Sequence, residues 1–207
     1  STFVQAQEIS AKSPHPDPTM NINSWNFIIT RYARNGFGHE ALRCFKQMQD
    51  AGIRPNSVTY ASVLKACGIV RSLETGEYID GEVRKQGLLH IDVVIGTALV
   101  DMYSKCGALE KALDVFELLP VKNVVTWSAI IGGYAHNGQG DDALKFFRLM
   151  RDAGICPNAI TYMCVLKACG IVGSLKIGQD VDTEIRKQGL MQKHAALGTA
   201  LVDMYLK

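Results

Sequence analysis

The stretch TYASVLKACGIV at Thr59–Val70 returns almost unchanged as TYMCVLKACGIV at Thr161–Val172, an offset of 102 residues. The shorter sequences RKQGL and GTALVDMY recur at the same offset. Aligning residues 22–105 with residues 124–207 gives 47 identities in 84 positions without a gap. Chance does not produce identity at that level. The chain is therefore a tandem array, and its fold is deduced from the repeating unit.

The 102-residue period divides into three segments of 35, 36 and 31 residues, at 22–56, 57–92 and 93–123. Each segment opens with apolar residues spaced by three and four, as Trp25, Ile28 and Tyr32 are in the first. That spacing places them on one face of a helix. We expect each opening helix to end at a glycine: Gly36, Gly68 and Gly107.

A second amphipathic pattern follows the opening one. In the first segment it contains Ala41, Phe45 and Met48, and Gly52 and Pro55 close it. A helical hairpin of this kind cannot bury both faces alone, so each unit must pack against its neighbours. The sequence therefore predicts an all-α fold, an α-solenoid of helix-turn-helix repeats.

Composition excludes several classes of protein. No run of eighteen apolar residues exists, so the sequence predicts no membrane contact through a spanning helix. The chain has 22 basic and 20 acidic residues, a net charge of +2, which excludes a polybasic binder but allows a local basic stripe. None of the six cysteines forms a C-x-x-C pair, and we expect them to be reduced and mostly buried.

The two ends of the chain differ from the repeats. Residues 1–21 contain Pro14, Pro16 and Pro18, which predict an extended lead-in. The last unit, 195–207, holds only a first helix, and we expect the chain to be a fragment of a longer array. Apolar residues of that helix would lack a covering partner, which predicts fraying or self-association at this end.

The segment lengths and motifs resemble the pentatricopeptide repeat family, in the P, L and S variants of plant organelles. SWNFIITRYARNG with EALRCFKQMQDAGIRPN resembles a P motif, TYASVLKACGIVRSLETGEYIDGEVRKQGL an L motif, and VVIGTALVDMYSKCGALEKALDVFELLPVKN an S motif. The resemblance covers about nine-tenths of the chain and implies a right-handed superhelix. The implied units are P at 22–56, L at 57–92, S at 93–123, P at 124–158, L at 159–194 and a truncated S at 195–207.

The resemblance implies single-stranded RNA binding, with one base per repeat selected by a polar residue early in the first helix and by the last residue of the unit. The implied pairs are Asn26 with Asn56 for a pyrimidine, and Thr97 with Asn123 and Ser128 with Asn158 for adenine; Thr199 is the matching residue of the last unit. Short polar side chains are unfavourable inside helices, so their recurrence at one register supports this assignment. Helix capping alone would explain one or two of them.

Other positions of the RNA site follow from the same resemblance. Val94 and Val125 match the apolar residues that wedge between bases, whereas the first unit has Asn23 there. The L units pair Ala61 with Asp92 and Met163 with His194, and neither Ala nor Met can bond a base edge. Basic residues outnumber acidic ones on the first helices, which predicts an electrostatic track for the RNA backbone: Arg31, Arg34, Lys65, Lys105 and Lys167, with Lys207 at the end.

Two other functional classes require different sequence features. A deaminase domain of the kind that ends many proteins of this subfamily would need H-x-E and C-x-x-C, and neither occurs, so the sequence predicts no enzyme, no metal and no cofactor. A protein-binding solenoid of tetratricopeptide type would keep a uniform period of about 34 residues, which the mixed lengths contradict. Salt dependence separates the two binding modes, because RNA binding weakens as salt rises.

The resulting hypothesis is a sequence-specific RNA-binding array of a mitochondrion, or else a chloroplast. It would position a transcript for processing, namely cytidine-to-uridine editing by a domain outside this sequence. The alternatives are a protein-interaction solenoid and a splicing or stabilisation factor of the same organelle. Expected partners are single-stranded RNA, organellar RNA-processing proteins through the L repeats, and a second copy through the last repeat.

Overall fold

The computed structural model describes residues 20–206. The prolines of the expected extended lead-in therefore lie outside the described residues. Within that range the chain forms eleven α-helices and one short 3-10 helix, and no strand. The first helices of successive pairs are α2 (Ile22–Arg34), α4 (Ser57–Val70), α6 (Val93–Lys105), α8 (Val124–His136), α10 (Ala159–Val172) and α12 (Ala195–Tyr205). The second helices are α3 (Gly38–Asp50), α5 (Leu73–Lys85), α7 (Leu109–Leu118), α9 (Gly140–Asp152) and α11 (Leu175–Lys187).

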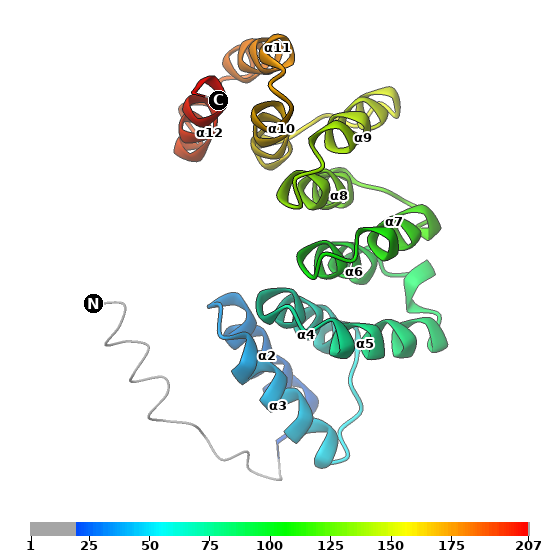
Figure 1. The fold of residues 1–207 in the computed structure, drawn as a ribbon. Helices are drawn as coiled ribbons and strands as arrows, with labels where there is room; N and C mark the ends of the chain where they lie inside the picture. The colour runs from blue at the N-terminus through cyan, green and yellow to red at the C-terminus, as the bar shows by residue number, and fades with distance from the viewer. Residues whose placement is uncertain (1–19, 207) are drawn as a thin grey trace, which may run out of the picture.

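The helices form two layers along a curved path (Figure 1). Successive first helices pack against one another from α2 to α12, and each first helix from α2 to α10 also packs against its own second helix. Figure 1 shows α4, α6 and α8 along the inner side of the arc, with α5, α7 and α9 outside them. The predicted all-α solenoid is therefore confirmed.

Burial repeats with the units, as expected of an array stabilised by nearest neighbours. The eighth residue of a first helix is fully buried between neighbouring helices at Ile29, Leu64, Val100, Ile131 and Leu166. Aromatic contacts join second helices to the following unit. For example, the Phe116 ring of α7 meets the Trp127 ring of α8 edge-on, with centroids 4.9 Å apart.

Glycine allows the second helix of a P unit to touch the next first helix. At Gly38, the first residue of α3, an added Cβ would lie 3.0 Å from the Ala66 carbonyl oxygen of α4. Gly140 repeats this relationship in α9, where the distance to the Ala168 oxygen of α10 would be 2.9 Å. The backbones approach too closely there for any side chain.

One expected helix end is wrong. Gly36 and Gly107 have φ of +83° and +79° and follow the ends of α2 and α6, as predicted. Gly68, however, lies inside α4 and packs against α6, where an added Cβ would lie 3.0 Å from the Lys105 Cδ. The helix ends instead at Arg71, a non-glycine residue with φ of +55°. The equivalent residue in the second copy is Gly173, so that copy avoids the left-handed strain.

The cysteines are free thiols, and four of the six are buried. Burial raises the pKa of Cys67 from 9.0 to about 12, and the pKa values of Cys164 and Cys169 to about 11. These thiols are therefore protonated at neutral pH and serve as small apolar side chains. Among residues 20–206, no group of three or more His, Cys, Asp or Glu side chains could hold a metal ion. In that same range no helix is long and apolar enough to cross a bilayer.

Candidate nucleic-acid interface

The free face of the first helices carries the predicted site residues. Positions 2, 5, 9 and 13 of a helix share one face because of the 3.6-residue turn. In α6 these positions are Val94, Thr97, Asp101 and Lys105. Val94 is 63% exposed, while Leu99 of the same helix is fully buried. Because the second helices cover the outer side of the first helices, this face looks into the arc.

The last residue of each predicted unit caps the first helix of the next unit. The side-chain oxygens of Asn56, Asn123 and Asn158 accept hydrogen bonds from backbone N–H groups in the first turns of α4, α8 and α10. These three residues therefore cap helices. Their amide groups stay available: no residue within 20–206 accepts a hydrogen bond from any of the three Nδ2 atoms.

The fifth residues of the polar units do not cap helices. Asn26 donates from Nδ2 to the Asn56 Oδ1 at 3.1 Å, which joins the first predicted pair directly. The Asn26 Oδ1 accepts a 2.6 Å bond from the Thr59 hydroxyl. Thr59 is the third residue of α4, and its hydroxyl also accepts from the Asn56 N–H at 3.1 Å. The pair is thus held by a third side chain from the following unit.

The next polar pair meets only through such a third side chain. The Thr97 and Thr126 hydroxyls lie 2.8 Å apart, and the Thr126 hydroxyl donates to the Asn123 Oδ1 at 3.2 Å. Thr126 is fully buried and is the third residue of α8. The predicted partners Thr97 and Asn123 make no direct hydrogen bond within the described part of the chain.

The pair of the second P unit repeats this arrangement. The Ser128 and Thr161 hydroxyls are 2.7 Å apart, and the Thr161 hydroxyl lies 3.1 Å from the Asn158 Oδ1. Ser128 also donates to the Val124 carbonyl at 2.7 Å. Ser128 is only 5% exposed, so Asn158 is the more accessible member of the pair.

The L units have no comparable polar group. The third residues of the helices that follow them are Ile95 and Leu197, both fully buried. Asp92 uses its carboxylate to cap α6 through the N–H groups of Val94 and Ile95. His194 precedes α12 without a side-chain cap bond.

The three bridging threonines are missing from the sequence-based site. Their signal is present in the sequence: among the five described units that another unit follows, a third-position Thr follows each one with a polar fifth residue and no other. Thr199 itself, the fifth residue of α12, is exposed.

A ladder of exposed β-branched side chains runs beside the pairs. Val94 and Val125, the predicted wedge residues, are 63% and 55% exposed at the second position of their helices. Val58 and Ile160 occupy the same position in the L units and are 53% and 56% exposed. These last two residues are absent from the predicted site, although their register is identical. Asn23, the polar exception, is also exposed.

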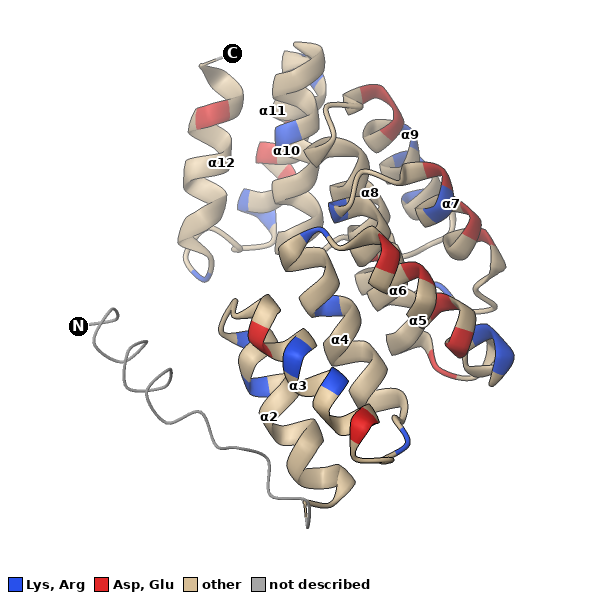
Figure 2. Cartoon of the chain, turned by 60° about the horizontal axis from the view of Figure 1, so that its bottom comes forward, with Lys and Arg blue, Asp and Glu red and all other residues tan. Residues whose placement is uncertain are grey.

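Charge separates the two layers. The described first helices carry five basic residues against Asp101 and Asp203. Figure 2 shows acidic residues among basic ones along the outer helices α5, α7 and α9, and in α5 and α7 the acidic residues outnumber the basic ones. Lys105 forms a 2.6 Å ion pair with Asp101, whereas no ion pair within residues 20–206 involves the other four predicted basic residues. Those four are exposed: Arg31, Arg34, Lys65 and Lys167.

Taken together, a two-layer array of helical hairpins with polar pairs, an apolar ladder and unpaired cations on its inner face defines an α-solenoid with a surface suited to a strand-like ligand. Models of the PPR repeat family match residues 20–68 and 122–170, and the PPR repeat model matches 97–124. The chain belongs to the pentatricopeptide repeat family.

Relatives in Arabidopsis thaliana extend this similarity over most of the chain. A mitochondrial pentatricopeptide repeat-containing protein is 45% identical over 155 residues, 75% of this chain and 24% of its own length. A chloroplastic one is 35% identical over 187 residues, 90% of this chain and 30% of its own. This chain spans between about a fifth and about a third of the length of such relatives.

Solved structures show the same fold. The pentatricopeptide repeat protein PPR10 from maize superposes with a TM-score of 0.63 at 25% identity, over 90% of this chain and 27% of that one. PPR10 in complex with an 18-nt psaJ RNA element gives a TM-score of 0.65 at 21% identity, over 86% of this chain and 26% of PPR10.

Proposed function

We propose that this chain is a single-stranded RNA-binding segment in which the inner face takes one base per unit. The observation that carries the proposal is the recurrence of a polar pair at one register in three units, each beside an exposed β-branched residue. Base edges require fixed donors and acceptors, and the faces of bases require apolar surface. The complex of PPR10 with RNA supports the same use of a related solenoid.

The unit order proposed is that of the PLS subclass: P, L, S, P, L and the first helix of an S unit. Base selection falls to Asn26 with Asn56, Thr97 with Asn123, and Ser128 with Asn158, and Thr199 would act in the last unit. With RNA parallel to the chain, the expected target is pyrimidine–any–A–A followed by two undefined positions. Ordering a flexible strand offsets much of the contact energy, so we expect an affinity of roughly 1 μM.

The wider role proposed is to position an organellar transcript for cytidine-to-uridine editing by a domain outside this sequence. Relatives with mitochondrial and chloroplastic names support an organelle, with the mitochondrion preferred here. The L units, which lack polar fifth residues at Ala61 and Met163, would contact other RNA-processing proteins. Splicing or transcript stabilisation in the same organelle is the alternative process.

Fluorescence anisotropy tests the RNA proposal. The chain is titrated with a labelled RNA containing CNAA and with a matched RNA in which both A bases are changed to G, each at two salt concentrations. Tighter binding to CNAA that weakens with salt supports the proposal. Equal binding to both RNAs would reject the base assignments. Absence of binding by the folded chain would instead favour a protein-binding solenoid.

A further inference from the structure

We infer that the third residue of each first helix is a positioning residue for the preceding unit, and that Thr59, Thr126 and Thr161 fix which atoms the pairs present to a base. This inference rests on the proposed RNA binding. Among the five described units that another unit follows, each with a polar fifth residue is followed by a fully buried threonine at this position. Both units with an apolar fifth residue are followed by a fully buried aliphatic residue, Ile95 or Leu197.

Hydrogen-bond accounting explains this correlation. A fully buried hydroxyl without a partner is costly, and each third-position threonine has two partners, the capping asparagine and the polar fifth residue of the preceding unit. A polar fifth residue at a nearly closed helix junction needs a partner in turn: Asn26 is 7% exposed and Ser128 is 5% exposed. The residue at the fifth position of one unit is therefore coupled to the residue at the third position of the next unit.

The bridging threonine also gives the pair a direction. In the contact between the Thr97 and Thr126 hydroxyls either atom can donate, and we assign the Thr126 hydrogen to the Asn123 Oδ1, which can only accept, so that Thr97 donates to Thr126. The Thr97 hydroxyl then uses its hydrogen in the bond to Thr126, so it can only accept a hydrogen bond from a base. The Asn123 Nδ2 can only donate one. Ser128 reaches the same state, because its hydrogen goes to either Val124 or Thr161.

An acceptor beside a donor matches the Watson–Crick edge of adenine, which offers the N6 amino group as donor and N1 as acceptor. Guanine offers the reverse at these two positions, with O6 as acceptor and N1–H as donor. The first unit differs: Thr59 donates to the Asn26 Oδ1, and the Asn26 Nδ2 donates to the Asn56 Oδ1. The outward groups left there are N–H donors. The polarity of each pair therefore depends on its fifth residue, Asn26 in the first unit and Thr97 or Ser128 in the others, which a threonine holds in every case.

Loss of one bridge tests this directly. In Thr126→Val, anisotropy is measured on RNAs with A or G opposite the third unit and, separately, opposite the fourth. We expect the preference for A over G to fall about threefold to tenfold at the third base only, the range of one hydrogen bond. Affinity for the fourth base and the salt slope stay unchanged, and Thr126→Ser restores the preference. Thr161→Val makes the same comparison at the fourth base.

Ser62→Ala is the matched control. The Ser62 hydroxyl lies 2.7 Å from that of Thr30 and joins α2 to α4 without touching a pair. Ser62→Ala therefore removes an equivalent hydrogen bond between units, and we expect the base preference to stay unchanged. The inference is overturned if Thr126→Val binds RNA with the wild-type preference, or if the variant alters both bases equally. If the wild-type chain binds RNA without any base preference, the inference about the threonines is overturned but the proposed RNA binding stands. If the chain does not bind RNA, both proposals are overturned.

A gain of function gives a second test. Ala61→Thr with Asp92→Asn places the side chains of an adenine pair in the second unit, but leaves Ile95 beneath them. Adding Ile95→Thr supplies the bridge. We expect a preference for A at the second base only in the triple variant. An equal preference in the double variant would show that the bridge is dispensable.

Discussion

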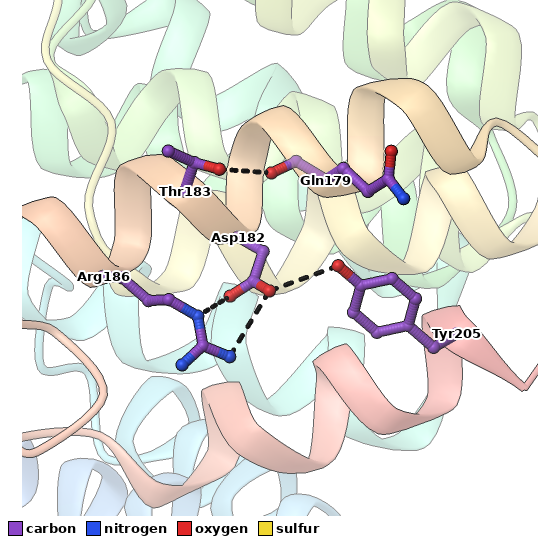
Figure 3. A network of polar contacts seen from close by, with 5 residues as sticks. All are labelled: Gln179, Asp182, Thr183, Arg186 and Tyr205. Atoms are coloured by element: carbon purple, nitrogen blue, oxygen red, sulfur yellow. Dashed lines mark hydrogen bonds and ion pairs between the residues drawn. The ribbon is translucent and has the colours of Figure 1, made fainter.

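The Tyr103 hydroxyl donates a 2.8 Å hydrogen bond to the Asp80 Oδ2 and thereby joins α6 to α5 of the preceding unit. The same bond recurs 102 residues later, where Tyr205 donates to the Asp182 Oδ2 at 3.2 Å (Figure 3). In both copies an arginine four residues after the aspartate bonds the other carboxylate oxygen. The environments differ, because Tyr103 is 2% exposed and Tyr205 is 46% exposed.

Phenylalanine substitutions at the two tyrosines should have unequal effects. Tyr103→Phe leaves a buried carboxylate oxygen short of a partner and should lower the free energy of unfolding by about 1–3 kcal/mol. Tyr205→Phe removes a hydrogen bond that water can replace, and it should lower the free energy of unfolding by about 0.5 kcal/mol or less. Urea unfolding followed by far-UV circular dichroism measures both, and equal losses would contradict the role assigned to burial.

Stability should fall at alkaline pH. Burial raises the pKa of Cys67 from 9.0 to about 12 and those of Cys164 and Cys169 to about 11. Below pH 9 these thiols are protonated in both folded and unfolded chains, so they add no pH dependence. Between pH 9 and about 11 the unfolded chain loses protons that the folded chain keeps, and each thiol lowers stability by about 1.4 kcal/mol per pH unit.

Urea midpoints measured from pH 8 to pH 10.5 with reductant present test this dependence. Cys67→Ala with Cys169→Ala should flatten the alkaline slope while lowering stability at pH 8, because the variant also removes packing. An unchanged slope would assign the loss of stability at alkaline pH to the buried tyrosines Tyr60 and Tyr162, whose pKa values burial also raises.

The sequence is sufficient to predict the solenoid because the 102-residue offset and the helical spacing are visible in the letters alone. It fails at Gly68, since glycine serves equally as a helix end and as a point of close packing, and only the neighbouring helix decides between them. It also misses Thr59, Thr126 and Thr161, because their bonds cross a unit boundary. Position within one repeat does not reveal a contact made by the next.

Lysines at neighbouring units should contribute unequally to RNA affinity. Lys65 and Lys105 both lie on the inner face, but Lys105 is already paired with Asp101 at 2.6 Å. Lys65→Ala should weaken binding to all RNA sequences and reduce the salt slope by about 1, because one fewer counterion is displaced. Lys105→Ala should change the slope by less. Anisotropy titrations across a salt series measure both, and a larger effect at Lys105 would place the backbone track elsewhere.

The β-branched ladder should support binding without regard to sequence. Val58→Ala and Val125→Ala remove methyl groups from the second position of α4 and α8, where 53% and 55% of each residue is exposed. If stacked bases cover one methyl group, each variant should lose about 0.8 kcal/mol, which is about fourfold in affinity. The preference for A over G should not change. An effect at Val125 alone would restrict the ladder to the S and P units.

In the 207-residue chain taken alone, self-association should proceed head to tail. Val202 and Tyr205 of α12 are 55% and 46% exposed, whereas their counterparts in α6, Val100 and Tyr103, are buried. The 102-residue offset makes α12 the repeat copy of α6, and α8 the repeat copy of α2. Because α6 packs against α8, α12 of one molecule should pack against α2 of another in the same way. A large apolar residue, Phe27, is 65% exposed on α2.

Such a contact joins two different surfaces, so it produces open chains rather than a closed dimer. Sedimentation velocity should therefore show a weight-average mass that rises continuously with concentration. Val202→Lys blocks one surface and Phe27→Lys the other, and each variant alone should remain monomeric. Mixing the two variants leaves one compatible pair of surfaces and should yield heterodimers and nothing larger. A wild-type chain that stays monomeric at every concentration would exclude this contact, and a mixture that stays monomeric would place the association on other surfaces.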